Sequence, residues 1–462
     1  MKICTIHIDD EVNCRIGGLR PDELEILWNK FGIFVEGYRH MPSFQLRRWD
    51  GKIRFFDKNG KTYTKILDEI YPYLTTWGYE INLEDHRIDP VIITDRVDED
   101  CFDLPEYKLR PYQVEVVNAL LAEGSGFAIC ATGSGKTAMC AALSMMLYMN
   151  GLQTLVIVPS KDLVNQTVSE FKHHLQKYSD VLTIGEYSGG QKDIDHPIVV
   201  ATWQSLQNVP HYMHYFKAVI IDEAHGAKAE VIKELINVHG KHISHRYGCT
   251  GTFPKAQTDA YSLKLSIGTI VKEVRAKWLI EQGYLAEIQI DPIETIDENP
   301  GMPDYAAERS YLTAFSKRNA GIARYIESLR DIHGNTLVLV PTNALAQGRE
   351  ITEMIDGAVY LDGGSKTEFR QEQYDQYASK DNMIIIASAG IASTGISIDR
   401  IFCMVLVDTG KSFVKCIQSV GRGMRKKGDK TKIHVTDIHS KLKYAKKHYR
   451  DRKNYYIEAE YP

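Results

Sequence analysis

The stretch from Ala131 to Thr137, Ala-Thr-Gly-Ser-Gly-Lys-Thr, constrains the fold more than any other part of the chain. The residues before it, Phe127–Cys130, predict a short buried strand, and Ala138–Tyr148 predict a helix because they contain few helix breakers. A glycine-rich turn between a strand and a helix directs backbone N–H groups at an anion. We expect Lys136 to reach the terminal phosphates of a nucleotide and the Thr137 hydroxyl to bind Mg²⁺.

The match to a strict phosphate loop is incomplete, because Cys130 stands where that pattern has its first glycine. Gly133 and Gly135 still provide the tight turn, so the sequence predicts a variant phosphate loop. A turn that merely connects a strand to a helix is the alternative. The predicted nucleotide-binding residues of the loop are Thr132, Gly133, Ser134, Gly135, Lys136 and Thr137.

Length and composition indicate a globular protein of about three domains. The chain has 462 residues, of which 44% are hydrophobic and 25% charged, and no run approaches the roughly 18 apolar residues of a membrane span. Its start lacks the pattern of a signal peptide. The eight cysteines are scattered without a CxxC pair, which argues against a zinc site or a disulfide framework. We therefore expect a reducing cytoplasm and no membrane partner.

The first segment, residues 1–97, contains no nucleotide motif but carries a concentrated positive charge. Pro21–Phe31 predicts a short helix. The stretch from Arg39 to Lys65 contains eight basic residues and two aspartates, so its net charge is +6. The turn signals Asp50-Gly51 and Asn59-Gly60 predict a small β-ribbon. Clustered cations indicate contact with a DNA backbone, whereas the alternative is a solvated hairpin face. The residues that we expect to bind DNA here are Arg47, Arg48 and Lys52.

An acidic and irregular segment, Asp95–Asp103, predicts a linker to the next domain. After it, Leu109–Gln113 precedes an apolar-periodic helix over Val114–Leu121. We expect Gln113 to read an adenine edge, because its amide offers both a donor and an acceptor, and we include Arg110 in the same site. The alternative is a proline that starts a helix beside an exposed glutamine.

Apolar strands alternate with helices beyond the phosphate loop, which is typical of a parallel sheet covered by helices. The strands are Leu155–Val158, Ile198–Ala201 and Ala218–Ile221. The third is followed by Asp222-Glu223-Ala224-His225, at the end where open α/β sheets bind their ligands. We expect Asp222 to hold Mg²⁺ through a water and Glu223 to orient and deprotonate the attacking water. A capped helix start is the structural alternative.

A second alternation of predicted strands and helices follows, and it contains no second phosphate loop. Helical residues Pro303–Ile332 come first, and the predicted strands are Leu337–Val340, Ile384–Ala387, Cys403–Val407 and Lys432–Val435. Arg422 and Arg425 are three residues apart and would project to one side of a helix, as fingers that stabilise charge in phosphoryl transfer or as a plain basic face. From Arg422 to Lys453 the net charge is +10, which is compatible with a solubilising tail and with DNA contact.

In order along the chain, these motifs resemble the superfamily 2 helicases and translocases, and within them the phage UvsW-type branch-migration helicases. The matching motifs are Leu109–Gln113, Ala131–Thr137, Val158–Lys161, Thr202–Ser205, Asp222–His225, Thr250–Thr252, Val340–Thr342, Ser393–Ile398 and Gln418–Arg425, and the basic run Arg47–Lys52 also resembles the small N-terminal domain of the phage proteins. Ser397 departs from the Asp or Asn of many relatives.

The resemblance assigns roles to further residues. His225, Thr250 and Thr252 would couple the nucleotide state to the movement of the lobes. Gln418, Arg422 and Arg425 would reach the γ-phosphate as catalytic residues with Lys136 and Glu223, and Gly395 would join the nucleotide site. The residues that would lie along the tracked DNA strand are Lys161, Thr202, Gln204, Thr342 and Thr394.

We therefore expect an α/β fold of two tandem RecA-like parallel-sheet lobes with a small N-terminal α+β domain and a short basic C-terminal extension. The predicted domains are a DNA-binding domain (1–97), an ATP-binding lobe (98–285), a second lobe (286–440) and the extension (441–462). The predicted function is ATP- and Mg²⁺-dependent remodelling of branched DNA, such as forks and Holliday junctions, in recombination, repair or replication. The predicted partners are recombination or single-strand-binding proteins, in a host cytoplasm if the chain is phage-encoded. The alternatives are an RNA helicase, a translocating restriction subunit and a nucleotide-gated DNA clamp.

Overall fold

The computed structural model describes residues 2–222, 229–251, 253–254, 256–297, 301–341, 344–392, 400–408 and 432–458. The chain divides into two compact units, one of Met1–Cys130 and Gly135–Glu273 and one of Ala131–Ser134 and Val274–Pro462. The second unit begins upstream of the predicted lobe boundary at 285, and the N-terminal domain shares a unit with lobe 1. The predicted domain limits stay predictions.

The N-terminal domain (residues 2–85) is a four-stranded sheet in the order β5-β2-β1-β6, covered by two helices. Alternate residues of β1 face a core that includes Ile6, Leu27 and Phe55, because successive side chains of a strand point to opposite faces. The predicted helix at Pro21–Phe31 is confirmed, ending one residue earlier. The elements are β1 (Lys2–Ile8), β2 (Asn13–Gly17), α1 (Pro21–Lys30), β5 (Lys61–Tyr63), η2 (Thr64–Ile66), α3 (Leu67–Thr76) and β6 (Tyr79–Asp85).

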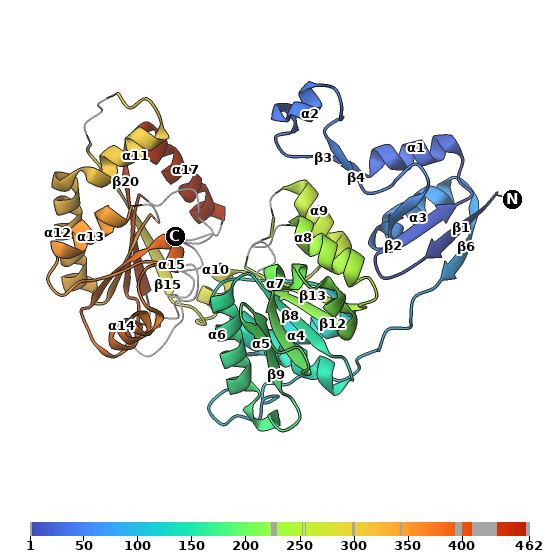
Figure 1. Ribbon diagram of the computed structural model, residues 1–462, viewed down its shortest axis with the longest axis horizontal. Coiled ribbons are helices and arrows are strands. Elements are labelled where there is room, and N and C mark those ends of the chain that lie inside the picture. Colours follow the sequence, from blue (N-terminus) through green and yellow to red (C-terminus); the bar gives the residue numbers. More distant parts are fainter. Residues whose placement is uncertain are drawn as a thin grey trace. The chain divides into compact units, whose positions relative to one another are not determined.

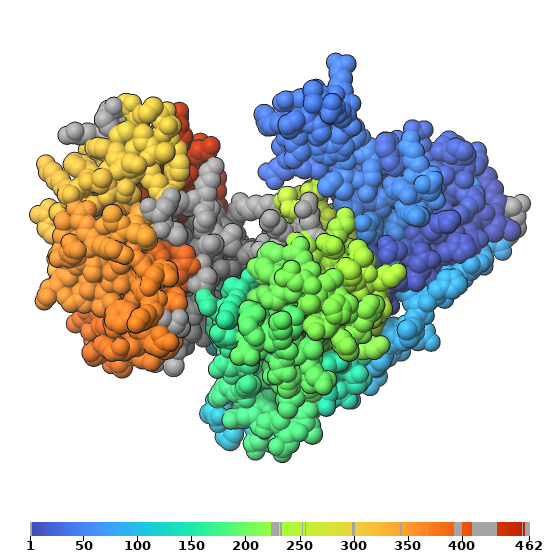
Figure 2. Space-filling view, in the orientation of Figure 1, coloured from blue at the N-terminus to red at the C-terminus, as the bar shows by residue number. Residues whose placement is uncertain are grey.

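An arm, residues 32–54, interrupts this domain, and here the predicted β-ribbon is wrong in part. β3 (Gly32–Phe34) pairs with β4 (Lys52–Arg54), and between them lie η1 (Tyr38–His40) and α2 (Pro42–Gln45). Asp50-Gly51 therefore lies in the loop between α2 and β4 and does not directly join two neighbouring strands. Pro42, at the first position of α2, favours a helix start within this loop. The Asn59-Gly60 turn is confirmed, since Phe56 and Thr62 pair across it. The arm carries α2 away from the sheet and projects from the surface (Figures 1 and 2).

The connection to lobe 1, residues 86–110, contains neither helix nor strand, as predicted for Asp95–Asp103. It is nevertheless packed on lobe 1, because Val97, Phe102 and Leu104 are buried. The backbone N–H and C=O of Val97 both hydrogen-bond the Asn118 side chain at 2.9 Å. The connection is thus an irregular strap that follows the surface of its unit.

Lobe 1 (residues 111–273) is built on a sheet in the order β10-β9-β11-β8-β12-β13-β7-β14, whose central strands from β11 to β7 are parallel. The strands predicted at 127–130, 155–158, 198–201 and 218–221 and the helix at 138–148 are confirmed. Its strands are β7 (Ser125–Cys130), β8 (Thr154–Val158), β9 (Ile184–Ser188), β10 (Gln191–Lys192), β11 (Ile198–Thr202), β12 (Ala218–Asp222), β13 (His245–Thr250) and β14 (Ile270–Val274). Its helices are α4 (Pro111–Glu123), α5 (Lys136–Met149), α6 (Lys161–His174), η3 (Gln176–Tyr178), α7 (Trp203–Gln207), η4 (Pro210–Tyr215), α8 (Ala229–Glu234), η6 (Leu235–His239) and α9 (Gln257–Ser266).

Helix α9 holds the N-terminal domain on lobe 1. Lys264 Nζ lies 2.6 Å from Glu69 Oε1, and the Tyr261 ring packs edge-on against Phe55 with centroids 4.9 Å apart. Leu265 is part of the N-terminal core. These contacts join the two parts into one unit.

Lobe 2 (residues 274–458) contains a parallel sheet in the order β15-β20-β19-β16-β18-β17. The four predicted strands are confirmed, while the helical stretch predicted over 303–332 is two helices, because Phe315 has a non-helical ψ of 87°. The strands are β15 (Glu287–Thr295), β16 (Thr336–Val340), β17 (Val359–Leu361), β18 (Ile384–Ser388), β19 (Cys403–Val407) and β20 (Lys432–Ser440). The helices are α10 (Ala276–Glu281), α11 (Tyr305–Ala314), α12 (Ser316–His333), α13 (Leu345–Glu353), α14 (Thr367–Ser379), α15 (Ala389–Ala392) and α17 (Lys443–Glu458).

The basic C-terminal helix α17 is anchored to lobe 2. Arg452 donates to both carboxylate oxygens of Asp437 on β20, at 2.8 and 2.7 Å, and these side chains are only 1% and 0% exposed. Tyr456 donates to the same carboxylate at 2.9 Å. Glu308 of α11 accepts from the N–H groups of Tyr444 and Ala445 at the start of the helix, where a negative charge is favourable. Among the described helices, none is long and apolar enough to cross a membrane.

Replacing Arg452 by Ala tests this anchor. The substitution leaves the Asp437 carboxylate buried without its cation, which costs about 3–5 kcal/mol. We expect urea unfolding of lobe 2 to shift by that amount. The matched control is Arg450→Ala, an exposed arginine of the same helix, which should change stability by less than about 0.5 kcal/mol. Equal stabilities for the two variants would show that α17 is not held by this pair.

Candidate functional site

The predicted nucleotide residues of lobe 1 meet at the carboxyl edge of its parallel sheet. Strand β13 lies between β7, which leads into the phosphate loop, and β12, which ends at Asp222. In register, Cys249 of β13 lies beside Asp222 on one side and Ala128 on the other. Because parallel strands end at the same edge, one intervening strand separates the loop from Asp222. Thr250, the last residue of β13, is buried between them.

The loop itself has a backbone that glycine favours. Gly133 and Gly135 both have φ of 84°, a region where other L-residues are strained. A Cβ on Gly135 would also collide with the side-chain amide of Gln113. Lys136 opens α5 and donates from Nζ to the carbonyl of Cys130 at 3.3 Å. The turn, the lysine and the helix N-terminus therefore have the arrangement that fits a nucleotide phosphate.

Cys130 fills the position where the strict pattern has glycine, and its side chain is fully buried. Burial raises the pKa of the Cys130 thiol to about 12. A hydrogen bond to Cys249 and burial together raise the pKa of the Cys140 thiol. The thiols of Cys130 and Cys140 are therefore neutral, and both lie near Lys136. Cys130 takes its place without entering the loop, which explains how the chain tolerates the replaced glycine.

Gln113 is buried, with only 2% of its surface exposed, so the alternative of an exposed glutamine is wrong. Its Oε1 accepts from the backbone N–H of Arg110 at 2.8 Å, which closes the first turn of α4. Arg110 in turn donates to the Tyr112 hydroxyl at 3.2 Å. The remaining side of the amide lies against Gly135. The structure thereby brings the predicted base reader next to the phosphate loop.

Three residues predicted along the DNA strand lie at the carboxyl ends of β8 and β11. Lys161 begins α6 with an exposed side chain, and Gln204 donates to the Pro159 carbonyl at 3.3 Å. Thr202 is only 5% exposed, and its hydroxyl accepts from the Ser205 N–H at 3.2 Å as the N-cap of α7. We therefore interpret Thr202 as a residue that positions this loop. Lys161 and Gln204 are accessible to a strand.

Besides the sheet edge of lobe 1, the arm also carries a polar surface. The sequence predicted Arg47 and Arg48 of this surface but not its shape. A hollow of about 580 Å³ on the arm contains three arginines and two aromatic residues. Trp49 donates from Nε1 to the Lys52 carbonyl at 2.8 Å, and Lys52 Nζ lies 4.6 Å from the Phe34 ring centroid. Arg47 has a left-handed φ of 55°, which is uncommon for arginine. The hollow is lined by Arg39, Phe44, Gln45, Arg47, Arg48, Trp49 and Asp50.

The remaining predicted residues lie outside the described part of the chain. In lobe 2, strands β16, β18 and β19 each end shortly before the segments that carry them. These residues are Glu223, His225, Thr252, Thr342, Thr394, Gly395, Gln418, Arg422 and Arg425. Their roles stay predictions.

Three protein families match successive parts of the chain. Residues 19–84 match the N-terminal domain of the DNA helicase UvsW, residues 106–255 the res subunit of type III restriction enzymes, and residues 320–427 the helicase conserved C-terminal domain. The second match contains the phosphate loop and Asp222, and the third contains strands β16 to β19 of the second sheet. Helicase domains match both at the N-terminal side and in the second lobe, and we assign the chain as a DNA helicase. The observed fold of a small domain with two parallel-sheet lobes agrees with the prediction.

Individual relatives support this assignment. The helicase is 27% identical over 458 residues to the ATP-dependent DNA helicase uvsW of phage T4, covering 94% of this chain and 90% of the phage protein. It is 30% identical over 328 residues to a Halobacterium salinarum protein named as a Rad25 DNA 3'-5' helicase, but spans only 52% of that protein's length. A fragment of an HsdR subunit of a type I restriction enzyme from Vibrio vulnificus shares the fold, with a TM-score of 0.54 at 17% identity over 74% of this chain and 67% of the fragment.

The contact between Gly135 and Gln113 gives a direct test of the site. Gly135→Ala adds a methyl group at a positive φ and displaces the Gln113 amide. We expect affinity for a fluorescent ATP analogue to fall at least tenfold in an equilibrium titration.

Gly151→Ala is the matched control for this substitution. Gly151 also has a positive φ, 76°, but a Cβ there meets open space, so only the strain of about 1–2 kcal/mol applies. Thermal unfolding should report the backbone strain in both variants, with a further loss in Gly135→Ala from the displaced Gln113 amide, whereas ATP affinity should fall only in Gly135→Ala. Unchanged affinity in both variants would contradict the assignment of Gly135 and Gln113 to the nucleotide site.

Proposed function

We propose that this helicase is an ATP-driven DNA translocase that remodels branched DNA. The observation that carries the proposal is the packing of Gln113 against Gly135 within a sheet edge that also holds Asp222. This edge combines groups for a base, for phosphates and for a cation in the first lobe. The match of residues 19–84 to the N-terminal domain of the DNA helicase UvsW supports DNA as the substrate, and the resemblance to branch-migration helicases is the reason that we propose branched DNA.

In the proposed site, Gln113 reads the adenine, and the loop N–H groups and Lys136 hold the phosphates. Thr137 and Asp222 would hold Mg²⁺, and their positions after β7 and at the end of β12 fit a shared cation. When bound, Mg²⁺ neutralises negative charge on the phosphates. We assign Glu223 to orienting and deprotonating the attacking water, and Gln418, Arg422 and Arg425 to the charge that develops on the transferring phosphoryl group.

The proposed DNA contacts are to phosphate and sugar. Lys161 and Gln204 are available at the carboxyl edge of lobe 1, and the arm supplies Arg47, Arg48 and Lys52. Such contacts carry little sequence information and depend strongly on salt. This pattern suits a substrate that is defined by its branching. Recombination or single-strand-binding partners and a cytoplasmic location stay predictions.

The function is tested by comparing wild type with Lys136→Ala on three DNA substrates. We expect wild type to convert a Holliday junction and a fork with ATP and to leave a plain duplex intact. Lys136→Ala should lose both activities and at least 99% of DNA-stimulated ATP hydrolysis, because the phosphates lose their cation.

Lys172→Ala, an exposed lysine in the last turn of α6, serves as the control and should retain full activity. Stimulation by RNA in place of DNA would favour the RNA helicase alternative. ATP turnover without any remodelling of the branched substrates would contradict the proposal.

The arm is tested by its charge. Replacing Arg47, Arg48 and Lys52 together by Gln removes three cations that would contact phosphates. We expect affinity for a fork to fall and the slope of log K against log salt to decrease by about 2–3. The charge-matched control replaces Lys172, Lys177 and Lys217, three exposed lysines toward the amino ends of the lobe 1 strands. If both triple variants weaken binding equally, the arm makes no specific contribution.

A further inference from the structure

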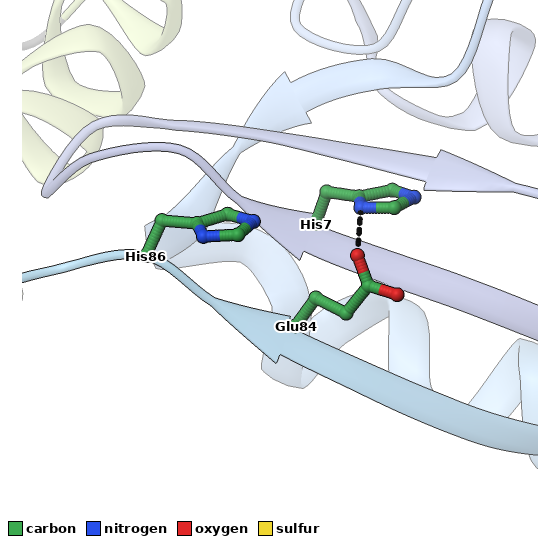
Figure 3. A group of neighbouring side chains, drawn as sticks. All are labelled: His7, Glu84 and His86. Carbon is green, nitrogen blue, oxygen red and sulfur yellow. Dashed lines mark ion pairs between the residues drawn. The ribbon is translucent and has the colours of Figure 1, made fainter.

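A cluster on the N-terminal sheet has the donor set of a transition-metal site. It consists of His7 on β1, Glu84 on β6 and His86 directly after β6 (Figure 3). One ligand atom from each residue lies within 4.8 Å of the other two. Two imidazole nitrogens and one carboxylate oxygen are ligands that Zn²⁺ and its neighbours in the first transition row accept.

The strand register brings these side chains together. β1 and β6 are parallel, and His7 is the direct partner of Glu84. Partners in register share a face of the sheet, and residues two apart in an extended segment also share a face. His86 donates its backbone N–H to the Ile8 carbonyl at 2.9 Å, which continues the pairing by one residue. The three donors therefore stand on a paired backbone, which limits how far they can separate.

Within the cluster, the ion pair joins His7 and Glu84 and does not include His86. His7 Nδ1 lies 2.8 Å from a carboxylate oxygen of Glu84. Figure 3 shows the His86 ring on the same side of the sheet as the other two side chains. The His7 and Glu84 side chains are 39% and 44% exposed, so an ion can enter from solvent. Arg15, the partner of His7 on the other side, is exposed and can keep its charge in water.

We propose that His7, Glu84 and His86 bind one divalent ion of the zinc, nickel or cobalt class. Bonds of about 2.1 Å place the donors of a tetrahedral ion roughly 3.4 Å apart. The observed spread of up to 4.8 Å closes by side-chain rotation alone, because all three side chains reach solvent. Mg²⁺ and Ca²⁺ prefer oxygen ligands, so the cluster does not compete for the metal of the nucleotide site.

The bound ion fastens the start of the strap to the N-terminal domain. His86 is the first residue of the strap over residues 86–110. Its neighbour Arg87 is already held by Asp85 at 2.6 Å and by Glu11 at 3.5 Å. A metal at His86 adds a second attachment at the point where the chain leaves the domain. An ion that binds only the folded domain also stabilises it.

The test is a calorimetric titration of the whole chain, first stripped with a chelator, with Ni²⁺ in excess Mg²⁺ and without nucleotide. We expect one ion per chain. His7→Ala and His86→Ala should each weaken binding at least tenfold. The control is His211→Ala, an exposed histidine in η4 of lobe 1, which should bind as wild type does.

Co²⁺ provides a second readout of which atoms bind. Absorption from d–d transitions without a sulfur-to-metal band supports imidazole and carboxylate ligands, whereas a sulfur band would place the ion at cysteines and overturn the proposal. Failure of wild type to bind, or unchanged binding in the His7→Ala/His86→Ala double variant, would also overturn it. These measurements need no ATP, so their outcome is independent of the proposed helicase activity.

Discussion

The close approach of Gln113 to Gly135 is the constraint on which the nucleotide site depends. The Gln113 amide nitrogen lies against Gly135 and cannot move away, because the amide oxygen accepts the Arg110 N–H and closes the first turn of α4. Gly135 cannot gain a side chain, because its φ is positive and the space is taken. The distance between the proposed base-reading group and the loop proposed to hold phosphates is therefore fixed by local geometry. Such preorganisation avoids an ordering cost when ligand binds.

Much of this architecture is predictable from local sequence. The strands of both lobes are short, continuous apolar runs such as Leu155–Val158 and Ile384–Ala387, which indicate strands buried on both faces. The phosphate loop is predictable because Gly, Lys and Thr have fixed mechanical roles at fixed spacing. These features depend on neighbours within a few residues, so an isolated sequence contains them.

The features that could not be predicted depend on residues far away in the sequence, which decide how strands pair and which charged side chain is buried. Asp50-Gly51 has the composition of a hairpin turn, yet β4 pairs with β3 beyond an intervening helix. Arg452 belongs to a lysine-rich helix that looks solvated throughout, and only the position of Asp437 shows which cation is buried. Pro111 followed by a glutamine at the third helical position was the available sign that Gln113 closes its own helix.

The attachment of the N-terminal domain to α9 links the arm to the nucleotide site. The Lys264–Glu69 pair has side chains that are 32% and 39% exposed, and exposed pairs contribute only about 0–1 kcal/mol. The apolar contacts matter more, because burying one side chain such as Leu265 contributes about 1.5–3 kcal/mol. α9 begins shortly after β13, whose last residue, Thr250, lies at the same sheet edge as Asp222. The helix that holds the N-terminal domain therefore belongs to the same lobe as this sheet edge, and the arm is attached to lobe 1 through it.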